Sequence, residues 1–344
     1  MKIKSIILLA LLLVMYSCKK EPKIKDMNSA NILFYNVENL FDTINDPKTH
    51  DDDFTPDGYK RWDTRRYFHK INNLTKVIES SFGGSNLPIL VGLAEIENED
   101  VLEDLVESHA LLPHQYNFAH VDSPDERGID VGLLYREEYF KLKEYEAIPV
   151  FFKRNPSDKT RDILHVVGEM MGEEVHVFVN HWSSRREGRE ESEHKRIDAA
   201  ETLKYQIDKV ESKNPKAYII IMGDFNDGPT NNSIWKTLKA RKIGDKKANL
   251  YNVVYDLDRA GDGSYSHKGD WTMLDQFIVS KNFIDNTDSL QVDVNDASVF
   301  DESWILFKHP KYKTIQPNKT YSGKKYHGGY SDHLPIKMKI TKKK

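Results

Sequence analysis

The chain has 344 residues, of which 39% are hydrophobic and 30% are charged, a composition typical of a globular protein with a sizeable core. Its 50 lysine and arginine residues and 54 aspartate and glutamate residues give a formal net charge of -4. This balance excludes a general electrostatic attraction to nucleic acid, so a polyanion would need a local basic patch or a bound metal. The single cysteine excludes an intrachain disulfide.

The first 27 residues are predicted to be a targeting segment and a tether. Lys2 and Lys4 precede ten apolar residues, Ile6 to Met15, and Cys18 follows closely. A spanning helix needs roughly 20 apolar residues, so this run is too short to be a stable anchor. The segment resembles a bacterial lipoprotein signal, which implies a signal peptide over residues 1–17, a lipid on Cys18 and a tether over residues 18–27. A plain secretory signal is the alternative.

The lipoprotein signal implies a protein outside the cytoplasm that reaches the membrane only through its lipid. Lys19 and Lys20 follow Cys18 without an aspartate, so we expect the outer membrane. The rest of the chain has no internal repeat and no second linker, which favours one domain over residues 28–340. We expect a monomer, with residues 341–344 as a basic, solvated tail.

Helical and strand-like segments follow one another along this domain. Apolar residues at helical spacing predict helices over residues 64–81, 99–112, 190–211 and 233–239. Residues 130–135, 163–167 and 337–340 are among the segments that favour strands. Strands outnumber helices, and several are joined too closely for an intervening helix. The fold class is therefore α/β (α+β), with sheets packed on each other and helices outside.

Six apolar segments carry acid, amide or imidazole side chains at one end. In the clearest case, Ile219 to Met222 form a strand that is interrupted by Gly223, Asp224 and Asn226. The other side chains at such positions are Asn36, Glu38, Glu95, Asn180, His181, Asp275, Asp332 and His333. Any one of these sites is compatible with ordinary turn chemistry. Six together favour an active site, because α/β enzymes place their chemistry at strand ends.

Hard oxygen donors dominate this set of side chains. The carboxylates are those of Glu38, Glu95, Asp224 and Asp332, and no cysteine or histidine cluster with zinc spacing accompanies them. The donor set favours Mg²⁺, with Mn²⁺ as a substitute, in a site that substrate phosphate completes. His181 and His333 are able to donate hydrogen bonds to a phosphoryl oxygen or a leaving group.

The motifs that contain these residues also have a recognisable order. They are Asn36-Val37-Glu38, Leu93-Ala94-Glu95, Val179-Asn180-His181, Gly223-Asp224-Phe225-Asn226, Leu274-Asp275-Gln276 and Ser331-Asp332-His333-Leu334-Pro335. From Asn31 to Ile340 the chain resembles the endonuclease/exonuclease/phosphatase superfamily, in particular a bacterial secreted nuclease-like branch. The resemblance implies a four-layer α/β/β/α sandwich, with two mixed sheets face to face, and a metal-dependent attack of water on a phosphorus ester.

The same resemblance implies a role for each motif residue at the metal. Glu95 would be the principal Mg²⁺ ligand. Glu38 and Asp332 would lie close to the metal, and Asn36 would support the metal shell. These roles agree with metal-assisted hydrolysis, in which the cation neutralises developing charge.

The remaining motif residues would act on water and phosphate, again by resemblance. Asp224 would orient or deprotonate the attacking water, and Asn226 would help to hold the water and the phosphate. His333 would contact the phosphate while Asp275 fixes its ring. His181 would stabilise the phosphoryl charge or assist the leaving group.

The chain departs from the better-known branches of the superfamily. It lacks the Cys-Asp-Arg motif of inositol polyphosphate phosphatases at Asp275. Glu38 stands where pancreatic deoxyribonuclease has arginine, and His181 stands where the exonuclease III branch has tyrosine. The chain therefore belongs cleanly to neither nuclease subgroup.

Two further segments bear on the substrate. Arg185 and Arg186 follow the His181 strand end, where they are placed to hold flanking phosphates while Trp182 stacks on a base. A charged loop neutralised by neighbouring glutamates is the alternative. Arg127 and Asp130 are candidates for the rim of the site, or for a turn that leads into a strand.

An acidic loop contains Asp51, Asp52 and Asp53, with Asp46 and Asp57 nearby. These carboxylates are potential Ca²⁺ ligands, but their spacing does not match an EF-hand loop. We therefore expect a solvated surface loop.

Three functions follow from the sequence. The first is a secreted or surface-anchored, Mg²⁺-dependent endonuclease that acts on DNA or RNA. The second uses the same centre on another phosphoester, such as a phospholipid head group or a sugar phosphate. The third, a non-catalytic binding lipoprotein, is disfavoured because every expected catalytic position holds a competent residue.

Overall fold

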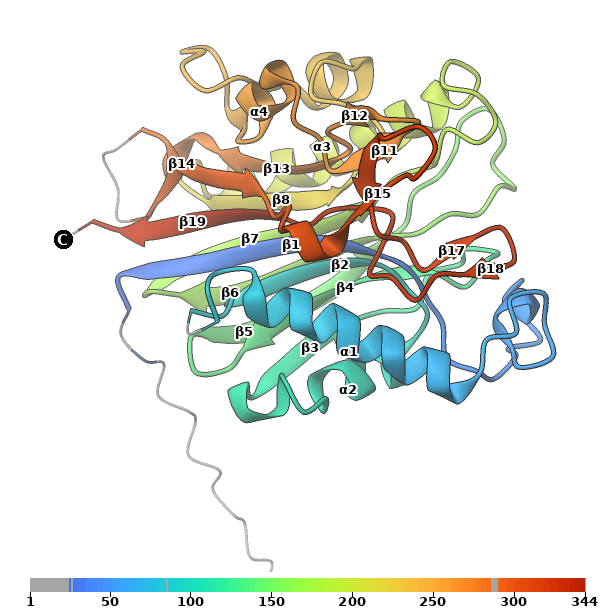
Figure 1. Ribbon diagram of the computed structural model, residues 1–344. Coiled ribbons are helices and arrows are strands. Elements are labelled where there is room, and N and C mark those ends of the chain that lie inside the picture. Colours follow the sequence, from blue (N-terminus) through green and yellow to red (C-terminus); the bar gives the residue numbers. More distant parts are fainter. Residues whose placement is uncertain (1–24, 26, 85, 286–289, 344) are drawn as a thin grey trace, which may run out of the picture.

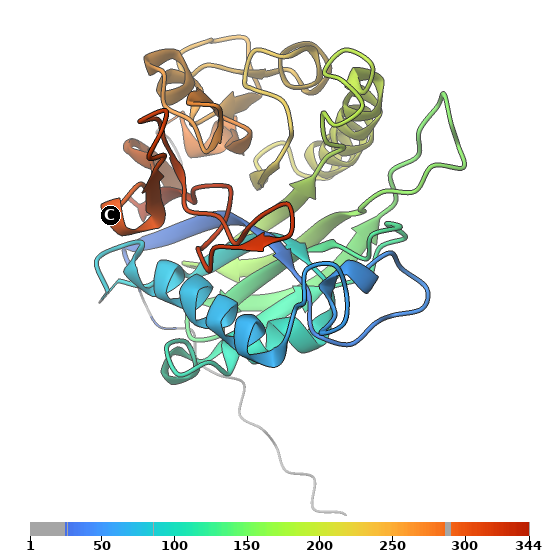
Figure 2. The same cartoon turned by 45° about the vertical axis from the view of Figure 1, so that its right-hand side comes forward.

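Two mixed β-sheets pack face to face in the computed structural model, with helices outside them (Figure 1). The structure describes residues 25, 27–84, 86–285 and 290–343. The helices α1 (Thr64–Ser80) and α2 (Glu99–Val106) cover one side of the molecule, and α3 (Glu193–Lys213) and α4 (Tyr255–Ala260) lie on the other (Figure 2). The predicted four-layer sandwich is confirmed.

The first sheet is built from both ends of the domain. Its strands are β1 (Ser29–Leu40), β2 (Leu90–Ile96), β3 (Tyr116–His120), β4 (Asp130–Arg136), β14 (Leu290–Val299) and β19 (Ile336–Lys342). Their spatial order is β14-β19-β1-β2-β4-β3, and β1 pairs with β2 in parallel. The N-terminal strand is therefore central, between β2 and the C-terminal strand.

The second sheet comes from the middle of the chain. Its strands are β5 (Phe140–Ile148), β6 (Ile163–Met170), β7 (Glu173–His181), β8 (Tyr218–Asp224), β9 (Ala240–Arg241), β10 (Leu250–Asn252) and β13 (Asp275–Ser280). Their spatial order is β5-β6-β7-β8-β13-β10-β9, and β7 pairs with β8 in parallel. Each sheet thus has a parallel pair at its centre, whose strands end at the same edge.

Shorter elements connect these strands. Small hairpins are formed by β11 (Tyr265–His267) with β12 (Asp270–Thr272), β15 (Leu306–Lys308) with β16 (Ile315–Pro317), and β17 (Tyr321–Ser322) with β18 (Lys325–Tyr326). Single helical turns lie at Asp52–Phe54, Leu112–His114, Lys281–Phe283 and Ser303–Ile305, and a π-helical segment lies at Ser233–Leu238.

The main core lies between the two sheets, where Phe34 of β1 and Met222 of β8 are fully buried. Burying one apolar side chain of this size stabilises the fold by roughly 1.5–3 kcal/mol. Gly92 of β2 faces the same space, and a Cβ atom there would overlap the Met222 side chain. Further apolar layers lie beneath α1 and α2 on one side and beneath α3 on the other.

The predicted helices are confirmed, with shifted ends. The helix predicted over residues 99–112 ends at Val106, and a separate turn at Leu112–His114 contains Pro113, which cannot continue a helix. The helix predicted from residue 190 begins at Glu193. The predicted signal peptide and Cys18 lie outside the described residues. Among the described residues, no helix has the length and apolar character needed to cross a membrane.

Candidate active site

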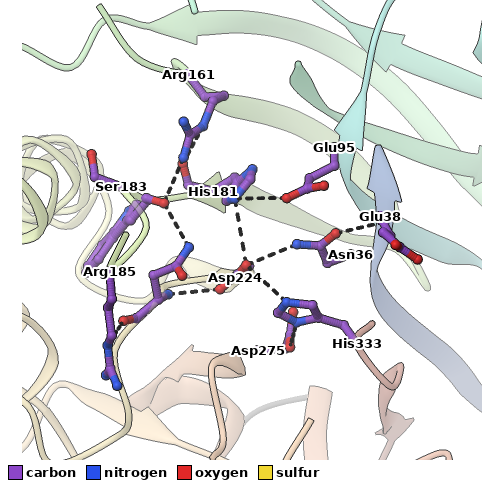
Figure 3. Close-up of polar contacts among 12 residues, drawn as sticks. Asn36, Glu38, Glu95, Arg161, His181, Ser183, Arg185, Asp224, Asp275 and His333 are labelled. Carbon is purple, nitrogen blue, oxygen red and sulfur yellow. Dashed lines mark hydrogen bonds and ion pairs between the residues drawn. The ribbon is translucent and has the colours of Figure 1, made fainter. Parts of the chain in front are cut away.

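A cavity of about 850 Å³ opens where the central strands end. The predicted site residues that line it are Glu95, His181, Arg185, Arg186, Asp224, Asn226, Asp332 and His333. Figure 3 shows that Asn36, His181 and His333 approach the Asp224 carboxylate from different directions. Predicted site residues from four of the strand ends thus line one cavity, and Asn36 and Asp275, from the other two, contact Asp224 and His333.

Strand pairing alone places three of these residues together. His181 is the last residue of β7 and lies opposite Asp224, the last residue of β8. Asp275, the first residue of the antiparallel β13, lies opposite Asp224 on its other side. The register of one sheet therefore puts two carboxylates and an imidazole side by side.

The backbone at the strand ends adopts a conformation that is unusual for non-glycine residues. The φ angles of Glu38, Asn39, Glu95 and Asn226 lie between 50° and 65°. Pairing between β1 and β2 is regular up to Asn36 and then shifts. Such left-handed residues cost about 1–3 kcal/mol each and persist where the surrounding structure holds them, which is common at functional sites.

Asp224 is the centre of the site. It is 2% exposed, and its Oδ2 accepts a hydrogen bond of 3.0 Å from Nδ2 of Asn36. Its Oδ1 accepts the N–H of Asn226 at 2.9 Å. Burial raises the pKa of Asp224 to about 6, against the opposing effect of the His333 imidazole. The carboxylate is therefore held in one orientation and is more basic than an exposed aspartate.

His333 is oriented by Asp275, as predicted. Its Nδ1 lies 2.6 Å from Oδ2 of Asp275, and its Nε2 lies 3.8 Å from Oδ2 of Asp224. Burial alone would lower the pKa of His333, but the carboxylates of Asp275 and Asp224 outweigh burial and raise it well above the ordinary value. Ser331 accepts the His333 N–H and donates to the Asn36 carbonyl. His333 is therefore a positioned, positively charged donor.

His181 has the opposite electrostatic environment. Its Nε2 lies 3.7 Å from Oδ2 of Asp224 and 3.9 Å from Oε1 of Glu95. Complete burial and the guanidinium groups of Arg161 and Arg127 lower its pKa well below the ordinary value. The site thus contains one charged and one uncharged imidazole on either side of Asp224.

Glu95 and Asp332 supply carboxylate oxygens of the kind that a hard divalent cation prefers. Both line the cavity, and Oε2 of Glu95 accepts the N–H of Asn39 at 2.8 Å, which fixes its carboxylate. Burial and the negative charge of Glu95 raise the pKa of Asp332. Two carboxylates that repel each other at one cavity wall are a suitable oxygen donor set for Mg²⁺ or Mn²⁺.

Glu38 is a correction to the predicted metal-ligand set. Its side chain points away from the cavity in Figure 3, and its oxygens accept the backbone N–H groups of Thr320 and Tyr321 at 2.6 Å and 3.3 Å. The Lys70 ammonium group lies 4.0 Å from Oε2 of Glu38. The strained backbone after Asn36 turns this carboxylate inward, where it fixes the loop before β17.

Trp182 is a second correction, because it is not available to stack on a base. Its side chain is 2% exposed and packs edge to face against Phe225, with ring centroids 4.7 Å apart. Its indole N–H donates to Oδ1 of Asn180 at 3.1 Å. Although Trp182 directly follows a strand end, its side chain packs in the core beneath α3, against apolar residues that are distant in sequence.

The two adjacent arginines have different environments. Arg185 donates to the Asn226 carbonyl and lies 3.1 Å from Oδ1 of the buried Asp227, so it supports the loop after β8. Arg186 is exposed and lines the cavity. Asp130 does not lie among the cavity-lining residues; it accepts hydrogen bonds from Ser123, which agrees with the turn alternative.

Arg161 and Tyr265 line the cavity and were not predicted from the sequence. Arg161 donates to the backbone carbonyls of His181 and Trp182 and lies 3.0 Å from Asp125. Tyr265 bridges to His333 through the backbone, with ring centroids 5.0 Å apart. Arg161 comes from an irregular connection and Tyr265 from the short strand β11, and neither stands at the end of an apolar run, so sequence periodicity could not indicate them.

Comparison with known proteins gives one family match. The model of the Endonuclease/Exonuclease/phosphatase family matches residues 31–342. No curated protein matches the chain.

Solved structures match most of the chain. A humanized D. rerio TDP2 has 15% identity and a TM-score of 0.56, with 91% of this chain and 99% of that chain covered. The human Nocturnin catalytic domain has 15% identity and a TM-score of 0.54, with 93% and 97% covered. A Bacteroides thetaiotaomicron mannosyl-6-phosphatase has 15% identity and a TM-score of 0.55, with 91% and 99% covered. At these identities the likeness is one of fold.

Proposed function

This chain belongs to the endonuclease/exonuclease/phosphatase family of metal-dependent phosphoester hydrolases, and on that basis we propose that it hydrolyses phosphodiester bonds in nucleic acid. The observation that carries the proposal is the position of Asp224. It lies within 4 Å of the histidines His181 and His333 and opens onto the cavity that Glu95 also lines. A general base, phosphate donors and acidic metal ligands are thus combined in one place.

Asp224 acts as the base in this proposal. Asn36 and the backbone of Asn226 hold its two oxygens, so the carboxylate is already oriented to accept a proton from water. Glu95 and Asp332 would hold Mg²⁺, which would neutralise charge on the phosphoryl oxygens.

The two histidines then have different tasks. His333, charged and fixed by Asp275, attracts a phosphoryl oxygen through Nε2. His181 is uncharged and stabilises the developing negative charge as a hydrogen-bond donor, because charging a buried imidazole next to Arg161 is unfavourable.

Basic side chains of the cavity support an anionic, extended substrate. Arg127 and Arg186 line it together with Lys159 and Lys195. Such side chains are suited to hold the phosphates on either side of a scissile bond. The burial of Trp182 removes the predicted stacking contact with a base, and this observation favours the second candidate, a phosphoester that is not nucleic acid.

Hydrolysis of a panel of substrates tests the proposal. The chain without its first 18 residues is incubated with plasmid DNA, RNA, mannose 6-phosphate and a generic aryl phosphodiester, with Mg²⁺ or EDTA, beside Asp224→Asn. We expect Mg²⁺-dependent cleavage of nucleic acid that is lost in the variant. Turnover of a small ester with intact DNA and RNA would support the second candidate, and no turnover of any substrate would contradict an enzymatic function.

We further propose that the protein is lipid-anchored and extracytoplasmic. This proposal is supported by the sequence of the first 20 residues alone. In cells, Cys18→Ala is expected to move the protein from the membrane fraction to the soluble extracytoplasmic fraction. Retention of the variant in the membrane fraction would contradict lipidation at Cys18.

A further inference from the structure

Three side chains of the kind that bind metal ions lie at the base of the β3–β4 hairpin. His120 is the last residue of β3, Asp130 is the first residue of β4, and Asp122 lies in the connection between the two strands. His120 pairs with Gly132, so continuing the antiparallel register by two residues places Asp122 opposite Asp130. Alternate residues of a strand share a face. The hairpin therefore brings one imidazole and two carboxylates to one face.

The distances agree with this register. Each of the three residues offers one potential ligand atom, and these atoms all lie within 4.8 Å of one another. Nε2 of His120 lies 3.3 Å from Oδ2 of Asp130, and Nδ1 of His120 lies 3.9 Å from Oδ1 of Asp122. A Zn–N bond and a Zn–O bond together span about 4.1 Å, so one cation is able to contact both Nδ1 and Oδ1.

One ring nitrogen of His120 lacks a hydrogen bond. The residue is 3% exposed, and its Nδ1 atom is buried without a hydrogen-bond partner among the described residues. An ionised carboxylate only accepts hydrogen bonds, so the contact with Asp130 places the proton of the neutral ring on Nε2. Nδ1 then directs a lone pair at the Asp122 carboxylate. Two acceptors that face each other are unfavourable unless a cation or a second proton lies between them.

We propose that Nδ1 of His120 and the carboxylate of Asp122 bind a Zn²⁺ ion, with Asp130 as the residue that orients the imidazole. A histidine that binds a metal usually donates its other ring N–H to a carboxylate, and Asp130 is in the position of that acceptor. Asp130 is itself fixed, because the backbone N–H and the hydroxyl group of Ser123 both donate to its Oδ1 atom. Water would complete the coordination of the ion.

Zn²⁺ is the cation that this donor set favours. Imidazole nitrogen suits Zn²⁺, whereas Mg²⁺ and Ca²⁺ prefer oxygen ligands. The side chain of Asp122 is 83% exposed, so it can adjust to a cation while the buried His120 and Asp130 stay in place. Of the described residues that line the catalytic cavity, none belongs to this group of three, so the proposed site differs from the catalytic metal site.

A cation at this position would hold the start of a loop that reaches the catalytic cavity. The loop after Asp122 contains Asp125, whose carboxylate lies 3.0 Å from the Arg161 guanidinium group. It also contains Glu126 and Arg127, which line the cavity. A bound Zn²⁺ ion would therefore restrict the loop that carries Arg127. It would stabilise the folded protein without entering the reaction, because a ligand that binds only the native state shifts the unfolding equilibrium.

Calorimetric titration of Zn²⁺ into the chelator-stripped full chain tests the site, with thermal unfolding as a second readout. Every protein in the comparison carries Glu95→Gln, which removes a carboxylate from the proposed catalytic metal site. Adding Asp122→Asn should weaken Zn²⁺ binding at least tenfold and reduce the Zn²⁺-induced rise in Tm. Adding Asp52→Asn instead is the matched control, because it removes the same charge from another exposed aspartate, and it should leave Zn²⁺ binding unchanged.

A second variant tests the imidazole. His120→Gln should weaken Zn²⁺ binding to the same extent as Asp122→Asn. If His120→Gln fails to fold, Asp122→Asn still provides the test, because its side chain is exposed. Equal Zn²⁺ affinity and stoichiometry with and without Asp122→Asn would overturn the proposal, as would the absence of Zn²⁺ binding in the Glu95→Gln protein. The second result would indicate that Asp130 alone holds the ring of His120.

Discussion

Acidic groups are buried in two regions of the molecule, and the side chains that surround them differ. Around Asp224, the carboxylates face imidazole and amide donors: Asp275 lies 2.6 Å from His333, and Asn36 donates to Asp224. Near the acidic loop, burial and the charges of Asp42 and Asp51 raise the pKa of Glu97. The carboxylates of the first region are stabilised by hydrogen-bond donors, whereas Glu97 in the second region favours its protonated form. Burial alone therefore does not identify a catalytic carboxylate; its partners do.

We expect the largest effect from a substitution of Asp224, at the centre of the site. Asp224→Asn keeps the size of the side chain and removes the base, so we expect the hydrolysis rate to fall by about 10³-fold or more. Steady-state kinetics on the best substrate measures this loss, with thermal unfolding as a control for folding. A variant that keeps more than about a tenth of the activity would exclude Asp224 as the base.

The second prediction tests the raised pKa of the buried Glu97 carboxyl group in metal-free protein. Burial and nearby carboxylates raise the pKa of Glu97 from 4.5 to about 8. The folded state therefore binds more protons than the unfolded state between these values, and the free energy of unfolding falls as pH rises from 4.5 to 8. Glu97→Gln cannot ionise, so in EDTA it should exceed the wild-type stability by roughly 4 kcal/mol at pH 8 and by little at pH 4.5.

Denaturant unfolding at both pH values checks this result, and Asp52→Asn is again the exposed control. An equal stability difference between Glu97→Gln and the wild type at pH 4.5 and pH 8 would show that Glu97 ionises normally. It would also remove the contrast between the two acidic regions.

The third prediction concerns Asp275, the hydrogen-bond partner of His333, rather than Asp224. Asp275→Asn removes the charge that fixes the His333 ring, so we expect kcat to fall by about 10- to 100-fold with a small change in KM. The loss of this carboxylate also lowers the pKa of His333, because burial is no longer opposed as strongly. The pH profile of kcat/KM should therefore lose activity at a lower pH than the wild type. An unchanged profile would mean that His333 does not act in its charged form.

The smallest effect concerns the two adjacent arginines. Arg186→Ala should raise KM about tenfold and leave kcat within about twofold, because we propose that the exposed guanidinium contacts substrate but not the reacting atoms. With nucleic acid, the slope of log affinity against log salt should fall by about one. Arg185→Ala is the matched comparison, and we expect it to lower Tm because Asp227 loses an ion pair. An unchanged KM and salt slope in Arg186→Ala would exclude substrate contact at this residue.

The sequence predicted the layers and most of the catalytic cluster because both depend on local patterns. Apolar runs that end in Gly, Asn or Asp define buried strands and the residues that emerge from them, and the parallel pairing of β7 and β8 then brings His181 to Asp224. Asp275 was found in the same way. Arg161 and Tyr265 had no such signal, because a loop and a short hairpin strand carry them and the positions of both depend on contacts with distant residues.

The sequence by itself determined which residue types reach the ends of the strands, since side-chain alternation and strand-breaking residues are properties of a few neighbouring positions. Only the tertiary structure decided where those side chains point and what surrounds them. It turned Glu38 toward the Thr320 backbone, buried Trp182 against Phe225 and buried Asp51 beside the exposed Asp52 and Asp53. Side-chain direction and desolvation depend on atoms that are distant along the chain, and the composition of a loop cannot supply them.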